Sequence, residues 1–164
     1  MLQKDELEQI NKGWKTIRVI WLALLGSLVV YLVVCMVIGD QLTISMAGSQ
    51  LEIFKYALFG VAVMTLFGAY FFRKLFLKSI AGMPGTGHQA ASHPAVGKYM
   101  VVIVIVMALL ESIGIYGVVL FMVSKDTVSL YQLMVLSAIG MLYFRPKKEE
   151  LIDVAEKMKS ADSG

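Results

Sequence analysis

The sequence predicts an all-α membrane protein with four transmembrane helices. Of its 164 residues, 58% are hydrophobic and only 16% are charged, whereas charged residues make up about 25% of an ordinary soluble domain. The mean hydropathy is +0.73, and the apolar residues are gathered into long runs separated by charged or glycine-containing segments. Runs of this length favour membrane-spanning helices over the core of a soluble domain.

Four apolar runs are long enough to cross a hydrocarbon core of about 30 Å at ~1.5 Å per residue. The predicted transmembrane helices cover residues 17–38, 53–77, 99–124 and 127–144. Only Lys125 and Asp126 separate the last two runs, so these two helices must fold back on each other as an antiparallel hairpin. Together the four form a transmembrane domain over residues 17–144.

The N-terminal segment, residues 1–16, has an amphipathic pattern. Leu7, Ile10 and Trp14 recur at helical spacing beside lysines, which predicts a helix lying on the membrane surface. A straight extension of the first transmembrane helix is the alternative, because Gly13 either separates two helices or is tolerated within one.

The C-terminal segment, residues 145–164, predicts a second amphipathic helix. Arg145-Pro146 ends the last apolar run, and early glutamates and later lysines agree with the helix dipole. One face of this tail helix is apolar and contains Leu151, Ile152, Ala155 and Met158. We expect this face to contact lipid or a protein partner.

The distribution of basic residues predicts the topology. Of the 15 Lys and Arg residues, all but Lys55 and Lys125 fall in the N-terminal segment through Arg18, in residues 73–98, or in the C-terminal segment from Arg145 onward. Because cytoplasmic segments carry the excess of basic residues, both termini and the loop of residues 81–97 are expected in the cytoplasm of a bacterial inner membrane. The lipid bilayer is the expected partner, and the clustering at helix ends does not suit nucleic-acid binding.

The loop of residues 81–97 is rich in glycine and contains both histidines of the chain. His88 and His93 are weak candidates for metal ligands, since no Cys or carboxylate lies among them. The single cysteine, Cys35, has no partner for an intrachain disulfide. No cofactor is predicted, and without a nucleophile–base pair or a phosphate loop the sequence does not favour an enzyme.

The main candidate for a functional residue is Glu111, the only charge within residues 99–124. It lies near the middle of a predicted transmembrane helix, where an acidic side chain costs about 2.5–3.5 kcal/mol. Such a carboxyl must be protonated, hydrogen-bonded or exposed to a polar cavity. We expect Ser112 and Tyr116 to border one polar site with it, because the helix places them beside the carboxyl and about a turn further on.

Other small and polar residues are expected to serve helix packing. Ser27 and Tyr31 lie four apart on one face of the first transmembrane helix, a pattern more typical of helix contacts than of a site. The glycines expected to let helices approach closely are Gly60, Gly68, Gly114 and Gly117.

The stretch ALLESIGIYGVVLF around Glu111 resembles the ion-binding helix of the rotor-ring proteolipid, or c subunit, of rotary ATP synthases. The resemblance covers residues 99–124 and implies that Glu111, with Ser112 and Tyr116, carries a transported ion. The second helix has no Gln that would ligate sodium, so the implied ion is a proton rather than sodium.

Two hypotheses for function follow from these patterns. The first is a structural or accessory subunit of a membrane complex or homo-oligomer, in which Glu111 clamps helices together by hydrogen bonding. The alternative is a proteolipid-like subunit that translocates protons through Glu111, which would need several copies or a partner subunit because no other predicted transmembrane helix carries a charged residue near its centre.

Overall fold

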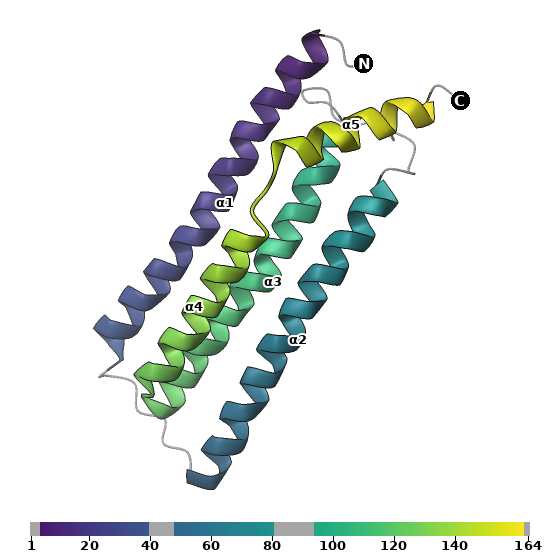
Figure 1. Cartoon of the computed structure of the whole chain (residues 1–164). Coiled ribbons are helices and arrows are strands. Elements are labelled where there is room, and N and C mark those ends of the chain that lie inside the picture. The colour runs from purple at the N-terminus through teal and green to yellow at the C-terminus, as the bar shows by residue number, and fades with distance from the viewer. Residues whose placement is uncertain (1–3, 40–47, 81–93, 163–164) are drawn as a thin grey trace. The chain divides into compact units, whose positions relative to one another are not determined.

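The computed structural model describes residues 4–39, 48–80 and 94–162, and this part of the chain is built from helices, without strands (Figure 1). The all-α prediction is confirmed. The helices of the described chain are α1 (Lys4–Ile38), α2 (Gly48–Ile80), α3 (Pro94–Ser124), α4 (Thr127–Tyr143) and α5 (Lys148–Asp162). Three of them, α1, α2 and α3, are long and apolar enough to cross a membrane.

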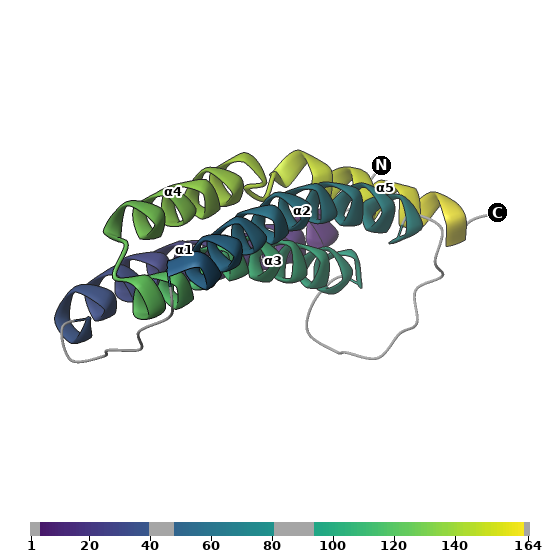
Figure 2. The same cartoon turned by 90° about the horizontal axis from the view of Figure 1, so that it is seen from below.

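The helix α4 differs from these three because it has only 17 residues. It reaches the length of a membrane-spanning helix only together with α5, across the break at residues 144–147 (Figure 2). The described chain therefore holds three candidate transmembrane helices, or four if α4 and α5 form one bent span.

The helix α1 is continuous from Lys4 to Ile38, so the predicted separation between residues 1–16 and the first transmembrane helix is absent. Gly13 does not end the helix. A Cβ atom at this position would overlap the side chain of Val96 on α3, so the glycine allows a close approach of α1 and α3. This continuity favours the alternative of a straight helical extension over a helix that is separated at Gly13.

The start of α3 also corrects the predicted loop of residues 81–97. Pro94 is the first residue of α3, and residues 94–97 are helical. Proline suits the first helical position because its missing N–H would have no partner there and its φ is already helical. The rest of this loop, with His88 and His93, lies outside the described residues.

The helices are distributed over two compact units. The terminal unit contains both ends of the chain and, among the described residues, comprises 4–22, 70–80, 94–106 and 145–162. The hairpin unit contains the turn between α3 and α4 and comprises 23–39, 48–69 and 107–144. Each unit buries apolar side chains of its own.

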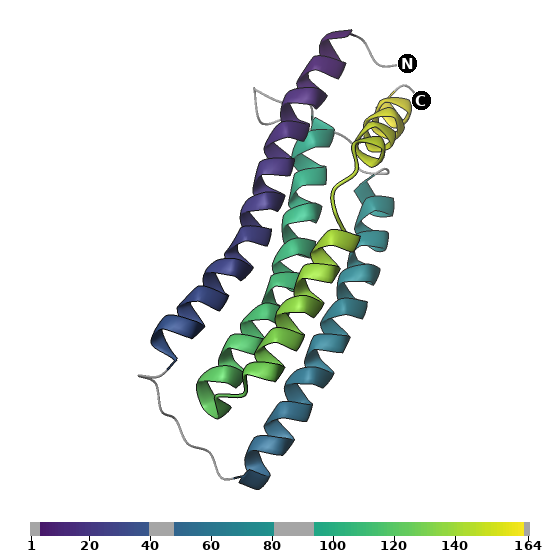
Figure 3. The same ribbon diagram turned by 60° about the vertical axis from the view of Figure 1, so that its left-hand side comes forward.

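In the hairpin unit, α3 and α4 run antiparallel on either side of the Lys125–Asp126 turn, as predicted (Figures 1 and 3). The Ser137 hydroxyl donates a hydrogen bond to the Leu110 carbonyl oxygen at 2.7 Å. Two glycines permit this close packing: a Cβ at Gly117 would lie 3.1 Å from Leu133 Cβ, and a Cβ at Gly140 would lie 2.9 Å from Leu110 Cδ2. Backbone and small side chains thus bring these helices together.

The four glycines expected to serve packing fall into two pairs. At Gly114 and Gly117 a Cβ atom would meet side chains of α1 or α4. At Gly60 and Gly68 no atom from elsewhere in the described chain lies within 4 Å of the Cβ position. The first pair therefore packs within the chain, whereas the second pair leaves open space along α2.

In the terminal unit, α5 buries the apolar face predicted from its sequence. Leu151, Ala155 and Met158 are buried, and Ile152 is half-buried. The Lys159 ammonium lies 2.9 Å from Glu6 Oε2 and so joins α5 to the first turn of α1. The tail of the chain is therefore packed against the rest of this unit.

The Gly117→Val variant is expected to destabilise the hairpin unit by about 1–3 kcal/mol, the usual cost of overpacking. The added methyl groups have no space between Leu133 Cβ and the Leu130 carbonyl oxygen, which would lie 3.1 Å and 3.3 Å from the new Cβ. Gly68→Val is the matched control, since it introduces the same side chain into open space. Thermal unfolding in mild detergent measures both variants, and equal shifts in Tm would contradict the packing described here.

Candidate functional site

The carboxyl of Glu111 is hydrogen-bonded to two hydroxyl groups of α1. Ser27 Oγ donates to Glu111 Oε1 at 2.5 Å, and Tyr31 OH donates to the same oxygen at 2.7 Å. All three side chains are half-buried and belong to the hairpin unit. Within the described chain, Oε2 of Glu111 has no hydrogen-bond partner.

Helix geometry explains why two α1 residues meet one carboxyl oxygen. Residues four apart lie one above the other on the same face of a helix, so Ser27 and Tyr31 present their hydroxyls together. Leu28, the neighbour of Ser27, has its Cδ2 2.7 Å from the Cβ position of Gly114. The missing side chain at Gly114 thus lets α1 approach α3 one turn from the carboxyl.

The hydroxyl of Ser27 gives the site two possible hydrogen-bonding patterns. Ser27 Oγ lies 2.7 Å from the Leu24 carbonyl oxygen as well as 2.5 Å from Glu111 Oε1, and its single proton can go to either acceptor. When Glu111 is ionised, the Ser27 hydroxyl donates its hydrogen bond to Glu111 Oε1. A protonated Glu111 donates to Ser27 Oγ while Ser27 donates to Leu24. The site can therefore hold the carboxyl in either protonation state without losing the contact between α1 and α3.

The predicted partners Ser112 and Tyr116 are not part of this cluster. Ser112 Oγ donates to the Leu109 carbonyl oxygen at 2.7 Å, a local bond common for serine in helices. Tyr116 is half-buried and makes no hydrogen bond to Glu111 in the described chain. Their spacing explains this, because positions one and five beyond Glu111 point about 100° and about 140° away from it around the helix axis.

The sequence contained one signal for the observed pairing. Tyr31 follows the basic residue Arg18 by the same number of positions as Glu111 follows Lys98. Two helices that start on the same side of a membrane would therefore bring these side chains to the same depth. Which helix faces Glu111 is a property of the packing and does not follow from this match alone.

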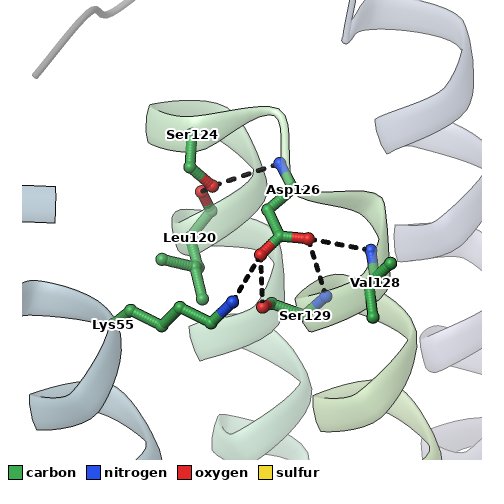
Figure 4. Close-up of polar contacts among 6 residues, drawn as sticks. All are labelled: Lys55, Leu120, Ser124, Asp126, Val128 and Ser129. Atoms are coloured by element: carbon green, nitrogen blue, oxygen red, sulfur yellow. Dashed lines mark hydrogen bonds and ion pairs between the residues drawn. The ribbon is translucent and has the colours of Figure 1, made fainter. Parts of the chain in front are cut away.

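A second polar cluster lies at the turn between α3 and α4 (Figure 4). Asp126 caps α4, because its Oδ1 accepts the backbone N–H groups of Val128 and Ser129 at 3.1 and 3.2 Å. Its Oδ2 accepts from Lys55 Nζ of α2 and from Ser129 Oγ, both at 2.6 Å. The hydrogen bond from Lys55, followed by that from Ser129, lowers the pKa of Asp126 to about 2.

A third cluster joins α2, α3 and α5 in the terminal unit. Arg73, of which only 8% is exposed, lies with its Nη2 2.7 Å from Glu150 Oε2. The fully buried Tyr99 hydroxyl lies 3.1 Å from the same carboxylate oxygen and accepts the backbone N–H of Lys147 at 3.1 Å. Buried charges require such partners, and here they hold the start of α5 in place.

Residues 4–39, 48–80 and 94–162 contain no group of three or more His, Cys, Asp or Glu side chains that could hold a metal ion. His88 and His93 are outside these ranges. The chain has no significant match among protein-family models, curated protein sequences or solved structures.

The stability difference between the wild type and Asp126→Asn is expected to depend on pH. The pKa of Asp126 is lower in the folded protein than the ordinary value of about 4, at about 2. The stabilising contribution of the carboxylate is therefore complete above about pH 4 and disappears as the pH falls toward 2. The measurement is the free energy of unfolding of both proteins in detergent at several pH values between 6 and 2.

The Lys55→Met background provides the control, because it removes the first cause of the lowered pKa. The same Asp126→Asn substitution should have a smaller and less pH-dependent effect there. A difference between the wild type and Asp126→Asn that stays constant down to pH 2 would show that the ion pair does not stabilise the folded state.

Proposed function

We propose that this protein is a small multi-pass membrane subunit with a structural or accessory role in a larger membrane complex or homo-oligomer. In this role Glu111 serves as a hydrogen-bonding clamp between α1 and α3. The observation that supports it most directly is the pair of hydrogen bonds from Ser27 and Tyr31 to Glu111 Oε1.

The energetics support a clamp. A carboxyl near the bilayer centre costs about 2.5–3.5 kcal/mol, and an interhelical hydrogen bond in a membrane contributes about 0.6–1.7 kcal/mol. Two such bonds contribute about 1–3 kcal/mol, which offsets from about a third to nearly all of this cost. A packing role is therefore sufficient to explain why the helix tolerates this residue.

The outer surface of the helices supports an assembly with other subunits. In α1 and α2 only 11% of the apolar stretch is buried within the chain, against 44% in α3. Large apolar side chains of α2, such as Tyr56 (74% exposed) and Met64 (72% exposed), point away from the chain. With open space at Gly60 and Gly68, α2 offers a surface suited to lipid and to a helix of another subunit.

The ion pairs support a four-span topology with both termini in the cytoplasm. Lys55 pairs with Asp126, both expected outside, whereas Arg73 pairs with Glu150, both expected inside. Along α2, Lys55 and Arg73 are separated by about 27 Å at a rise of ~1.5 Å per residue, close to the thickness of the hydrocarbon core. The uncharged residues 127–144 have the same length, so we propose α4 as the fourth span.

The alternative function is proton translocation, as the resemblance to the rotor-ring proteolipid implies. Two features of the site favour it. The Ser27 hydroxyl can accommodate both protonation states of Glu111, and Oε2 has no partner within the described chain. Both properties are compatible with a carboxyl that loads and releases a proton.

Substitution of Glu111 separates the two functions. In a clamp, Glu111→Gln should leave stability and assembly nearly unchanged, because the amide oxygen still accepts from Ser27 and Tyr31. Glu111→Leu should lose about 1 kcal/mol per missing bond, measured by unfolding and by the size of the purified complex. Tyr31→Phe should show part of this loss, and Tyr56→Phe is its matched control on an exposed position.

Proton translocation predicts a different pattern. Glu111→Gln would then abolish proton flux in liposomes while leaving assembly intact, and a hydrophobic carbodiimide would label Glu111 in the wild type. That outcome would favour proton translocation over the clamp as the function of Glu111. A Glu111→Leu protein that is stable, assembled and active would exclude both roles.

The topology can be tested by cysteine labelling in a Cys35→Ala background. Thr127 and Glu156 are both exposed, at the start of α4 and on α5. A membrane-impermeant maleimide added to intact cells should label Thr127→Cys and leave Glu156→Cys unlabelled until the cells are opened. Labelling of Glu156→Cys in intact cells would reverse the proposed orientation.

A further inference from the structure

A pocket of about 570 Å³ lies in the terminal unit, between α1 and the segment that leads into α5. Its lining consists of Trp14, Arg18 and Trp21 of α1 together with residues 145–149. This volume is within the range of about 300–1,000 Å³ found for small-molecule sites. None of the lining residues belongs to the Glu111 cluster, so the pocket is a site separate from that cluster.

The lining is strongly basic. Its charged residues are Arg18, Arg145, Lys147, Lys148 and Glu149, four cations and one carboxylate. Within the described chain none of the four cations takes part in an ion pair, whereas Lys12, Lys157 and Lys159 each pair with a carboxylate. Unpaired positive charge in a concave site favours the binding of an anion.

The position of the pocket along the chain favours a lipid as the source of that anion. Arg18 is the last charged residue before the uncharged residues 19–39, and Arg145 is the first after the uncharged residues 127–144. Both walls of the pocket therefore lie where apolar helices meet their charged ends, which is the level of the headgroups in a bilayer. Trp14 and Trp21 fit the same level, because tryptophan is enriched at membrane–water interfaces.

Buried side chains hold the backbone of residues 145–147, which form one wall of the pocket. The Tyr99 hydroxyl lies 3.1 Å from the Lys147 backbone nitrogen and 3.2 Å from its carbonyl oxygen. Arg73 Nη2 donates to the Arg145 carbonyl oxygen at 3.4 Å. Because these contacts hold the backbone of Arg145 and Lys147, the segment that carries the two basic side chains is ordered before any ligand arrives, which reduces the entropic cost of binding.

We propose that this pocket binds the phosphate-containing headgroup of an anionic phospholipid. The guanidinium groups of Arg18 and Arg145 can each offer two parallel N–H donors to phosphate oxygens. Lys147 and Lys148 add positive charge at the rim, and the two indole rings lie against the glycerol and the first methylene groups. The proposal does not depend on the role of Glu111.

Intrinsic fluorescence reports directly on this pocket, because the chain has only two tryptophans and both line it. Protein stripped of lipid in mild detergent is titrated with short-chain phosphatidylglycerol, with phosphatidylcholine of the same chain length and with glycerol 3-phosphate. We expect a saturable change with phosphatidylglycerol at a concentration at least about tenfold below that needed for phosphatidylcholine, since each basic residue near an anionic headgroup contributes about fivefold. Glycerol 3-phosphate should not saturate the signal in this range.

Two pairs of variants test the assignment to these residues. Arg18→Gln with Lys148→Gln removes two charges from the pocket, and Lys12→Gln with Lys157→Gln removes two from the same helices outside it. The pocket pair should weaken phosphatidylglycerol binding at least about tenfold, and the control pair should bind as the wild type. The single variant Lys148→Gln, at an exposed position, serves if the double variant does not fold.

Three results would overturn the proposal. Equal binding of phosphatidylcholine and phosphatidylglycerol would remove the selectivity for an anion. Saturation by glycerol 3-phosphate at the same concentration would identify a soluble phosphate compound as the ligand in place of a lipid. Equal losses of phosphatidylglycerol affinity in the two variant pairs would show that binding depends on the general surface charge of the protein and not on the pocket.

Discussion

The carboxyl of Glu111 imposes the strongest physical constraint on the hairpin unit. It is the only Asp, Glu, Lys or Arg side chain within residues 99–124, and its cost in an apolar environment must be offset by hydrogen bonds. Ser27 and Tyr31 provide them, and both belong to one face of α1. The rotation and the register of α1 against α3 are therefore set by these bonds, and the contact of Leu28 at Gly114 depends on the same register.

Two further clusters of polar side chains lie toward the ends of the helices. In the hairpin unit, Asp126 combines a helix cap with an ion pair to Lys55. In the terminal unit, the buried Arg73 and Tyr99 contact the half-buried Glu150 and hold the start of α5. Charges at helix ends are easier to solvate than charges at helix centres, so they can fix the ends without weakening the apolar middle. The proposed lipid pocket uses the same arrangement, with basic side chains where the apolar runs stop.

The sequence predicted local structure well because local structure depends on composition and short-range pattern. The turn at Lys125–Asp126 and the break that contains Arg145-Pro146 follow from charged residues and a proline that interrupt the apolar pattern. The predicted helix boundaries were wrong where a glycine or a proline is compatible with two structural roles. Gly13 was compatible with a helix break and proved to be a contact point for Val96, and Pro94 begins α3 inside the predicted loop.

The sequence by itself determined that the chain forms long apolar helices, that Glu111 needs a partner, and that Ser27 and Tyr31 share a helix face. Only the tertiary structure decided that these two hydroxyls supply the partner, and that Ser112 bonds to its own helix instead. The same holds for the pocket, whose walls come from opposite ends of the chain. The physical reason is that helix periodicity fixes which residues share a face, whereas the choice of the facing helix depends on packing between segments far apart in the sequence.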